Sequence, residues 1–125
     1  MIILTLNEIV SIHSKLINKT GGLDGVRDIG LLESAVASVN NSFDNVKQYP
    51  TIEEKAARFA FSIVSNHAFI DGNKRIGVFV MLMTLKLNKI EIVFSQVELI
   101  TLGLSIADGT FKYDEILYWI KEHKK

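Results

Sequence analysis

The sequence predicts an all-α protein, folded as one compact domain of about six helices that spans residues 1–125. Two observations support this fold class. Apolar residues recur at helical spacing in several separate segments, and three segments carry the Ser/Thr-x-x-Glu pattern of a capping box. An apolar content of 48% in 125 residues is enough for one domain with one core, and it argues against disorder.

The first two helices are predicted in the N-terminal third of the chain. A capping box at Thr5–Glu8 opens the first helix, and the glycines of "TGGLDG" end it. The apolar face of this helix consists of Leu6, Ile9, Val10, His13, Leu16 and Ile17. A second helix is expected over about Asp28–Val39, followed by the polar connection "NNSFDNVKQYP", which ends in the only proline.

The remaining helices are predicted after the proline. A capping box at Thr51–Glu54 opens the third helix, and Ile76–Leu87 is apolar on nearly every side, as expected for a helix at the centre of the fold. The segment "KIEIVF" is consistent with either a short strand or an extended link. A third capping box, Ser95–Glu98, opens the next helix, and "ADGT" ends it. The last helix carries the apolar residues Ile116, Leu117, Trp119 and Ile120.

Charge and composition exclude several classes of protein. Lys plus Arg and Asp plus Glu number 14 each, and a net charge of zero argues against a domain built mainly to bind nucleic acid. With no cysteine, the chain has no disulfide framework and no thiolate metal site. The N-terminus lacks the pattern of a signal peptide. The longest apolar run, "VFVMLMTLKL", is shorter than the roughly 20 residues of a membrane span. We therefore expect a soluble, cytoplasmic protein with no direct nucleic-acid or membrane contact.

The segment "SNHAFIDGNKRIG", Ser65–Gly77, places many polar groups between two strongly apolar helices. His67 is expected at the end of the third helix, and Asn73 is a candidate N-cap of the fourth. A helix start attracts anions through its free N–H groups and its dipole. Lys74 and Arg75 lie in this first turn, where cations oppose the dipole. A bound polyphosphate would offset that cost.

The same segment holds the groups that phosphoryl or nucleotidyl transfer needs. Asp71 places a carboxylate beside the anion site, and Mg²⁺ binds to such a carboxylate together with substrate phosphates. His67, with an ordinary pKa of about 6.5, is suited to take a proton from an attacking hydroxyl. Gly72 lets the backbone approach a ligand, while Phe69 is expected to anchor the segment in the core. Each residue alone has an ordinary structural interpretation, and their joint spacing favours a site.

These residues resemble the signature of the Fic/Doc superfamily, His-x-Phe-x-Asp/Glu-Gly-Asn-Gly/Lys-Arg. The matching positions are His67, Phe69, Asp71, Gly72, Asn73 and Arg75. The upstream "GGLDGVRDIGLLESAV" and the distal "LGLSIADGTFKYDEILYWI" are similar to the Doc (death-on-curing) branch, so the resemblance covers nearly the whole chain. The Fic pattern has Gly in place of Lys74 and a second Arg in place of Val78, and both differences are in the direction of Doc.

The resemblance implies a role for each residue of the motif. His67 would be the catalytic base toward a Ser or Thr hydroxyl, and Asp71 would hold Mg²⁺. The phosphates of ATP would lie on Gly72, Asn73, Lys74 and Arg75. In the Doc branch the nucleotide binds in the inverted sense, so its terminal phosphate faces the target. The resemblance thus implies a type II toxin that phosphorylates a translation factor, with elongation factor Tu as the expected target, and thereby arrests growth.

The resemblance also implies a partner. Doc toxins are held inactive by a small antitoxin whose helical tail lies in a groove on the toxin, and no Ser/Thr-x-x-x-Glu-Gly/Asn motif for self-inhibition is present. Two alternative functions stay open. One is a Fic-type AMP transferase (adenylyltransferase), which Lys74 and Val78 disfavour. The other is an inactive module that only binds an antitoxin, which the complete motif disfavours.

Three residues and one segment outside the motif also carry predictions. His13 is predicted to be a core-edge histidine rather than a site residue, and Arg27 to form a salt bridge or cap a helix. Trp119 is predicted to anchor the last helix in the core. In Fic folds the segment before the third helix forms a flap that docks the target chain. Here "SFDNVKQYP" occupies that place, and a docking role and a simple loop are both left open.

Overall fold

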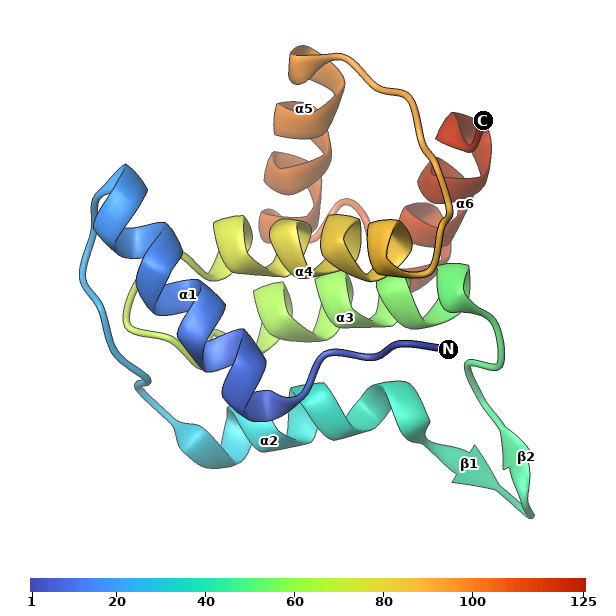
Figure 1. The fold of residues 1–125 in the computed structure, drawn as a ribbon, viewed down its shortest axis with the longest axis horizontal. Coiled ribbons are helices and arrows are strands. Elements are labelled where there is room, and N and C mark those ends of the chain that lie inside the picture. Colours follow the sequence, from blue (N-terminus) through green and yellow to red (C-terminus); the bar gives the residue numbers. More distant parts are fainter.

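The computed structural model describes residues 1–125 and consists of six α-helices, four of which surround a central pair (Figure 1). In chain order the helices are α1 Leu6–Thr20, α2 Ile29–Ala37, α3 Ile52–Asn66, α4 Asn73–Leu87, α5 Gln96–Ala107 and α6 Tyr113–His123. A 3₁₀ turn (η1, Ser38–Asn40) follows α2, and then two short strands, β1 Ser42–Phe43 and β2 Val46–Lys47. The prediction of an all-α domain of about six helices is confirmed.

The three capping boxes form where the sequence predicts them. The side chains of Thr5, Thr51 and Ser95 each accept a hydrogen bond from the N–H group three residues later, and the glutamate there accepts one from the cap's own N–H group. Asp28 caps α2 by accepting from the N–H group of Leu31. A cap of this kind stabilises a protein by about 1 kcal/mol, so these four helix starts are determined by local sequence.

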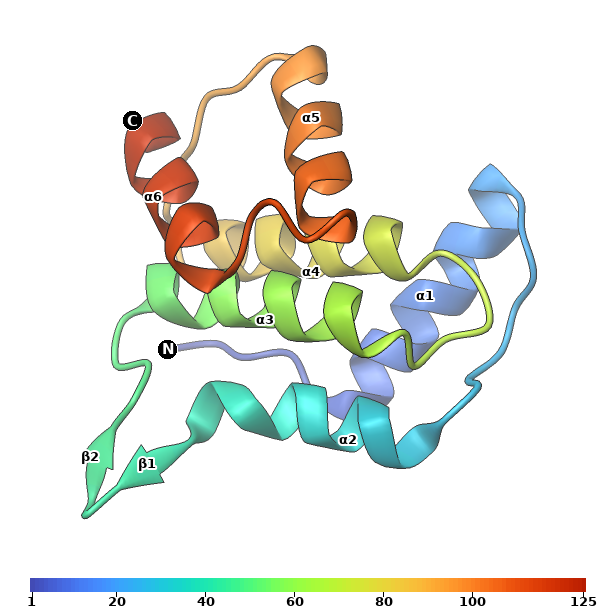
Figure 2. The same cartoon turned by 180° about the vertical axis from the view of Figure 1, so that it is seen from behind.

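The central pair of helices explains why α4 is apolar on nearly every side. Helices α3 and α4 lie side by side, with α1 and α2 on one flank and α5 and α6 on the other (Figures 1 and 2). Each flank therefore buries a different face of the pair. Although α4 is so apolar, neither it nor any other helix has the length and hydropathy to cross a membrane.

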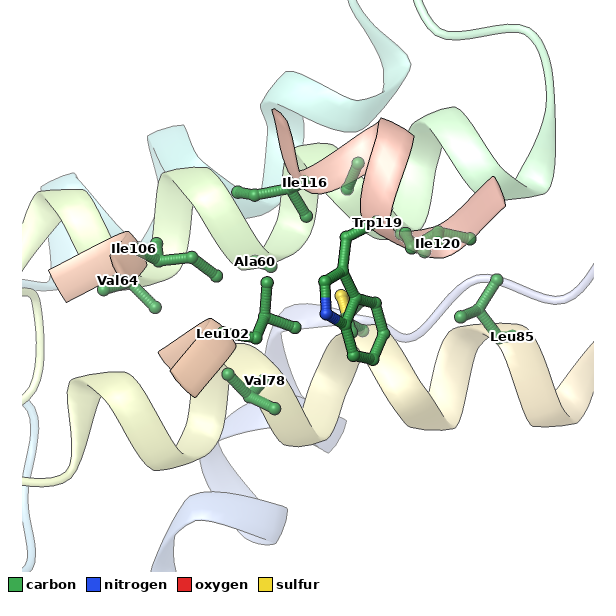
Figure 3. Close-up of a cluster of buried hydrophobic side chains, with 12 residues drawn as sticks. Ala60, Val64, Val78, Leu85, Leu102, Ile106, Ile116, Trp119 and Ile120 are labelled. Carbon is green, nitrogen blue, oxygen red and sulfur yellow. The ribbon is translucent and has the colours of Figure 1, made fainter. Parts of the chain in front are cut away.

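Two buried clusters fill the two flanks. The cluster toward α5 and α6 (Figure 3) contains Ala56, Ala57, Ala60, Val64, Val78, Met81, Leu85, Leu102, Ile106, Ile116, Trp119 and Ile120. The cluster toward α1 and α2 contains Leu4, Ile9, Leu32, Ala35, Val39, Phe59, Ile63, Ala68, Phe69, Ile76 and Val80. Trp119 extends from α6 toward α4 (Figure 3), which confirms its predicted role as the core anchor of the last helix.

The segment "NNSFDNVKQYP" forms a two-stranded hairpin, which the sequence analysis did not predict. Its turn residues Asp44 and Asn45 have φ of 50° and 64°, left-handed values that suit a two-residue hairpin loop. Phe43 pairs with Val46 across the hairpin, and both side chains are exposed. The hairpin precedes α3 whereas His67 follows it, so about 22 Å of helix separates the two (Figure 1). The hairpin therefore does not line the predicted site.

The C-terminus pairs with the segment that precedes α5. Ile92 forms an isolated antiparallel bridge with Lys124, so "KIEIVF" is an extended link rather than part of a larger sheet. His123 lies with Nε2 2.6 Å from Oε2 of Glu98 and with Nδ1 2.7 Å from the carbonyl oxygen of Trp119. Both partners accept hydrogen bonds, so the arrangement suits the imidazolium form of His123, in which both ring nitrogens donate.

We expect the protein to lose stability as the pH rises, through His123. Burial opposes the charged ring, but hydrogen bonds to Glu98 and to the Trp119 carbonyl prevail and raise the pKa of His123. This stabilisation is complete below the unfolded pKa of about 6.5 and is lost as the pH rises through the higher folded value. Urea unfolding across this range should show the decrease. Glu98→Gln keeps the capping box and should make the decrease shallower, and an unchanged slope would contradict the assignment.

Candidate active site

His67 lies where α3 ends, as predicted. Its backbone is left-handed, with φ 49° and ψ 43°, and it forms the C-cap of the helix. The carbonyl oxygen of His67 accepts hydrogen bonds from Nε and Nη2 of Arg27, while its imidazole is exposed and bonds to no protein group. A left-handed residue with a Cβ is uncommon, although histidine tolerates this conformation better than most. The chain turns sharply here and leaves the imidazole free to meet a substrate.

The segment that precedes α2 runs antiparallel to the loop after His67. The N–H group of Ile70 donates to the carbonyl of Gly25 at 3.1 Å, and the N–H groups of Arg27 and Asp28 donate to the carbonyl of Ala68 at 2.7 and 3.0 Å. Of the two roles predicted for Arg27, a salt bridge or a helix cap, the structure shows the cap, because the guanidinium binds the carbonyl of the α3 C-cap. The upstream segment "GLDGVRD" therefore supports the loop of the predicted site through backbone and side-chain hydrogen bonds.

The start of α4 differs from the prediction. Gly72, with φ 75° and ψ 20°, is the N-cap, and Asn73 is the first helical residue. The prediction of Asn73 as the N-cap is wrong because its side chain turns back onto the loop. Its Oδ1 accepts from the N–H group of Phe69 at 2.9 Å, and its Nδ2 donates to the Phe69 carbonyl at 3.0 Å. No side chain caps α4, so the N–H groups of its first turn are left for a ligand or water.

Phe69 anchors the loop in the core, which confirms its predicted role. Its ring is buried and stacks on His13 of α1, with the ring centroids 3.8 Å apart. His13, predicted at the edge of the core, is as fully buried as Phe69, and its Nε2 lies 2.7 Å from the carbonyl oxygen of Asp71. This contact to the loop was missed. The only trace of it in the sequence is a histidine on an otherwise apolar helix face.

The Asp71 carboxylate is partly exposed and is held by backbone groups. Its Oδ2 accepts from the N–H group of Leu23 at 3.1 Å, and its Oδ1 accepts from the N–H group of Gly72 at 2.8 Å. These hydrogen bonds, together with the charge of Arg75, keep the pKa of Asp71 below its ordinary value. Each oxygen retains a lone pair, so the carboxylate fits a metal ligand.

Asp71 would be the main protein ligand of any Mg²⁺ at this site. No group of three or more His, Asp or Glu side chains is placed to hold a metal ion. Mg²⁺ commonly binds through one or two carboxylates and completes its shell with phosphate oxygens and water. The donor set around Asp71 therefore suits a metal that arrives with a nucleotide rather than one held by the protein alone.

Arg75 is partly engaged with the end of α1. Its Nη1 donates to Oγ1 of Thr20 at 2.6 Å and to the carbonyl of Gly21 at 2.7 Å, while Nη2 lies 3.8 Å from Oδ1 of Asp71. A Cβ added at Gly22 would lie 2.6 Å from Oδ2 of Asp71 and 2.9 Å from Nη2 of Arg75. Gly22, predicted with the other glycines of "TGGLDG" only to end a helix, therefore also makes room for two charged groups of the site.

Lys74 is the cation of the site that has no carboxylate partner. It is exposed, and its Cγ and Cδ pass close to Gly103 of α5, where an added Cβ would lie 3.3 and 3.4 Å away. Beside it, an open groove of about 390 Å³ runs between α1, α4 and α5. The apolar side chains that line the groove are Leu16, Val78, Phe79, Leu82, Leu99 and Ile100.

The fold and this loop define a class of protein: a small helical domain that presents a histidine, a carboxylate and an uncapped helix start with two cations on one turn. The chain belongs to the Fic/DOC family, whose model matches residues 3–85. It is 27% identical over 109 residues to "Protein kinase doc" of Escherichia phage P1, covering 87% of this chain and 85% of that protein.

A second relative shows a higher identity over a shorter segment. "Toxin Doc" of Mycolicibacterium smegmatis is 47% identical over 55 residues, which cover 44% of this chain and 42% of that protein. The match thus spans less than half of the length of this relative, whereas the match to the phage protein spans most of both chains.

Proposed function

We propose that this protein is a Doc-type toxin that transfers the terminal phosphate of ATP to a Ser or Thr hydroxyl of a cytoplasmic protein, with elongation factor Tu as the expected target. The observation that carries the proposal is the free imidazole of His67 on the same loop as the uncapped start of α4. Membership of the Fic/DOC family and the likeness to a protein named as a kinase support phosphoryl transfer.

Each residue of the loop would have a separate role in this phosphoryl transfer. A ring nitrogen of His67 would take the proton of the attacking hydroxyl as its oxygen bonds to the terminal phosphorus and ADP leaves. Free N–H groups of Asn73 and of the next residues, with the charge of Lys74, would bind the phosphates. Asp71 would hold Mg²⁺, which neutralises phosphate charge when bound. Arg75 would contribute through Nη2, since Nη1 has protein partners.

Lys74 offers a test of the phosphate site with a matched control. Lys74→Met removes the charge and keeps most of the stem, so we expect about a tenfold rise in the KM for ATP, as for the loss of one charge-assisted hydrogen bond. Lys86→Met makes the same change in the last turn of the same helix and should leave KM unchanged. Steady-state kinetics with varied ATP would measure both, and equal effects of the two variants would contradict the assignment.

We further propose that a separate antitoxin inhibits the protein by laying a helical tail in the groove between α1, α4 and α5. The groove has an apolar lining, and Lys74 and Arg75 stand at its edge. A tail with an apolar face and acidic residues would match both features, and it would cover the phosphate site from the side. A purified antitoxin that binds the protein and leaves its phosphorylation activity untouched would refute this mode of inhibition.

The decisive experiment is to measure the intact mass of elongation factor Tu, and of the proteins in a host lysate, after incubation with this protein, Mg²⁺ and ATP. A gain of one phosphoryl group that is strongly reduced with His67→Asn, which keeps the left-handed backbone of this position, would establish the proposed activity. A gain of the size of AMP would establish the Fic-type AMP transferase in its place. No gain on any protein would favour an inactive module that only binds an antitoxin.

A further inference from the structure

Four carbonyl oxygens of the loop between α3 and α4 accept hydrogen bonds from other parts of the chain. The carbonyls of His67 and Ala68 accept from the segment before α2, and that of Phe69 accepts from Asn73. The carbonyl of Asp71 is held by His13, which lies 58 positions earlier in the chain. Helix α1 thus reaches, through one side chain, the residue whose carboxylate is proposed to hold Mg²⁺.

The ring of His13 is fixed on three sides. A carbonyl oxygen only accepts, so Nε2 of His13 carries the proton in its bond to Asp71. The ring stacks on Phe69, and its Nδ1 lies 3.7 Å from Oδ1 of Asp24. Asp24 is itself held by Oγ of Ser14 at 2.6 Å and by the N–H group of Gly25 at 2.8 Å. The donor at Nε2 therefore has little freedom to leave the Asp71 carbonyl.

We propose that His13 is a positioning residue of the active site, whose Nε2–H group fixes the Asp71 peptide and thereby directs the Asp71 carboxylate. The peptide that carries this carbonyl also carries the N–H group of Gly72, which donates to Oδ1 of the same carboxylate. A rotation of the peptide would therefore break both contacts. It would also disturb Gly72, whose left-handed conformation starts α4.

Three variants separate the hydrogen bond from the packing of the ring. His13→Gln can place an amide N–H where Nε2 lies, whereas His13→Asn places it nearer the position of Nδ1. His13→Phe keeps a ring that stacks on Phe69 and has no donor. The proposal predicts that Gln preserves the position of the loop, and that Asn and Phe do not. A purely structural role would instead favour Phe, because this variant keeps the buried ring.

The first test measures hydrogen exchange in the free protein and needs no activity. Exchange in the peptide that covers residues 68–75 should be about tenfold faster in His13→Phe and His13→Asn than in the wild type, the effect expected when one hydrogen bond is lost. His13→Gln should exchange at nearly the wild-type rate. Unchanged exchange in His13→Phe, or equally fast exchange in all three folded variants, would overturn the proposal.

The second test rests on the proposed function and measures binding of ATP in the presence of Mg²⁺ by calorimetry. We expect about tenfold weaker ATP binding in His13→Phe and His13→Asn than in the wild type, and little change in His13→Gln. Normal binding in a variant whose loop exchanges fast would overturn the link between His13 and Asp71. If the wild type itself binds no nucleotide, the proposed function fails, and the exchange measurement alone decides the role of His13.

Discussion

Replacing His67 by asparagine should lower the rate of phosphoryl transfer by about 10²–10⁴-fold, the contribution expected of a general base. The imidazole is exposed and has no protein partner, so its removal breaks no contact that holds the fold. The KM for ATP should change little, because the predicted phosphate ligands lie beyond His67 on the loop and in α4. A variant that retained wild-type kcat would exclude His67 as the base.

Asparagine is the appropriate substitution because His67 has a left-handed backbone. Asparagine adopts this conformation readily, whereas alanine in a left-handed conformation costs about 1 kcal/mol or more. His67→Ala therefore removes the imidazole and also strains the end of α3. Thermal unfolding followed by circular dichroism should show His67→Asn close to the wild type and His67→Ala below it. Equal loss of transfer in both variants would then be due to the missing imidazole.

The sequence was sufficient to predict the helices and most of the loop. Capping boxes at Thr5, Thr51 and Ser95 are local patterns, since every donor and acceptor lies within four residues. The apolar character of α4 predicted its central place, and that place is confirmed by the two clusters that pack on opposite flanks. The position of His67 at the end of α3 followed from the glycine and asparagine of the turn after it.

The parts of the site that sequence reasoning missed are contacts that residue type and spacing do not reveal. Gly22 is visible as a helix breaker, but its closeness to Asp71 and Arg75 depends on how α1 packs against α4. Asn73 has a good N-cap residue type, yet it is the first helical residue, because the backbone of Phe69 offers its amide two partners. Gly22 thus serves a contact between distant segments, and Asn73 serves a side-chain contact four residues back in the chain; periodicity and spacing reveal neither.

The hairpin before α3 was missed for a different reason, because its pairing is local but its sequence signal is weak. Asp44 and Asn45 are suited to a left-handed turn, but neither is the glycine that usually marks a two-residue hairpin in a sequence. Each strand has only two residues, too few to show an alternating pattern. The segment therefore looks like a polar loop in the sequence and forms a hairpin in the structure.

Phe69→Ala should lower the free energy of unfolding by about 3–5 kcal/mol, the usual cost of removing a buried phenyl ring. This is a large part of the roughly 5–15 kcal/mol that stabilises a typical domain. Ile70→Ala is the matched control, because this neighbour lies on the same loop and its side chain is 51% exposed. Its substitution should cost about 0.5 kcal/mol or less. Urea unfolding of the three proteins would measure the difference.

The same pair of variants tests which contact anchors the loop: the buried ring of Phe69, or the backbone pairing with the segment before α2. Phe69 stacks on His13, so its loss should also free the ring that binds the Asp71 carbonyl. Ile70 contributes a backbone bond to Gly25, which alanine retains. Hydrogen exchange in residues 68–75 should therefore rise strongly in Phe69→Ala and little in Ile70→Ala. No increase in Phe69→Ala would show that the pairing with the segment before α2, rather than the buried ring, holds Asp71 in place.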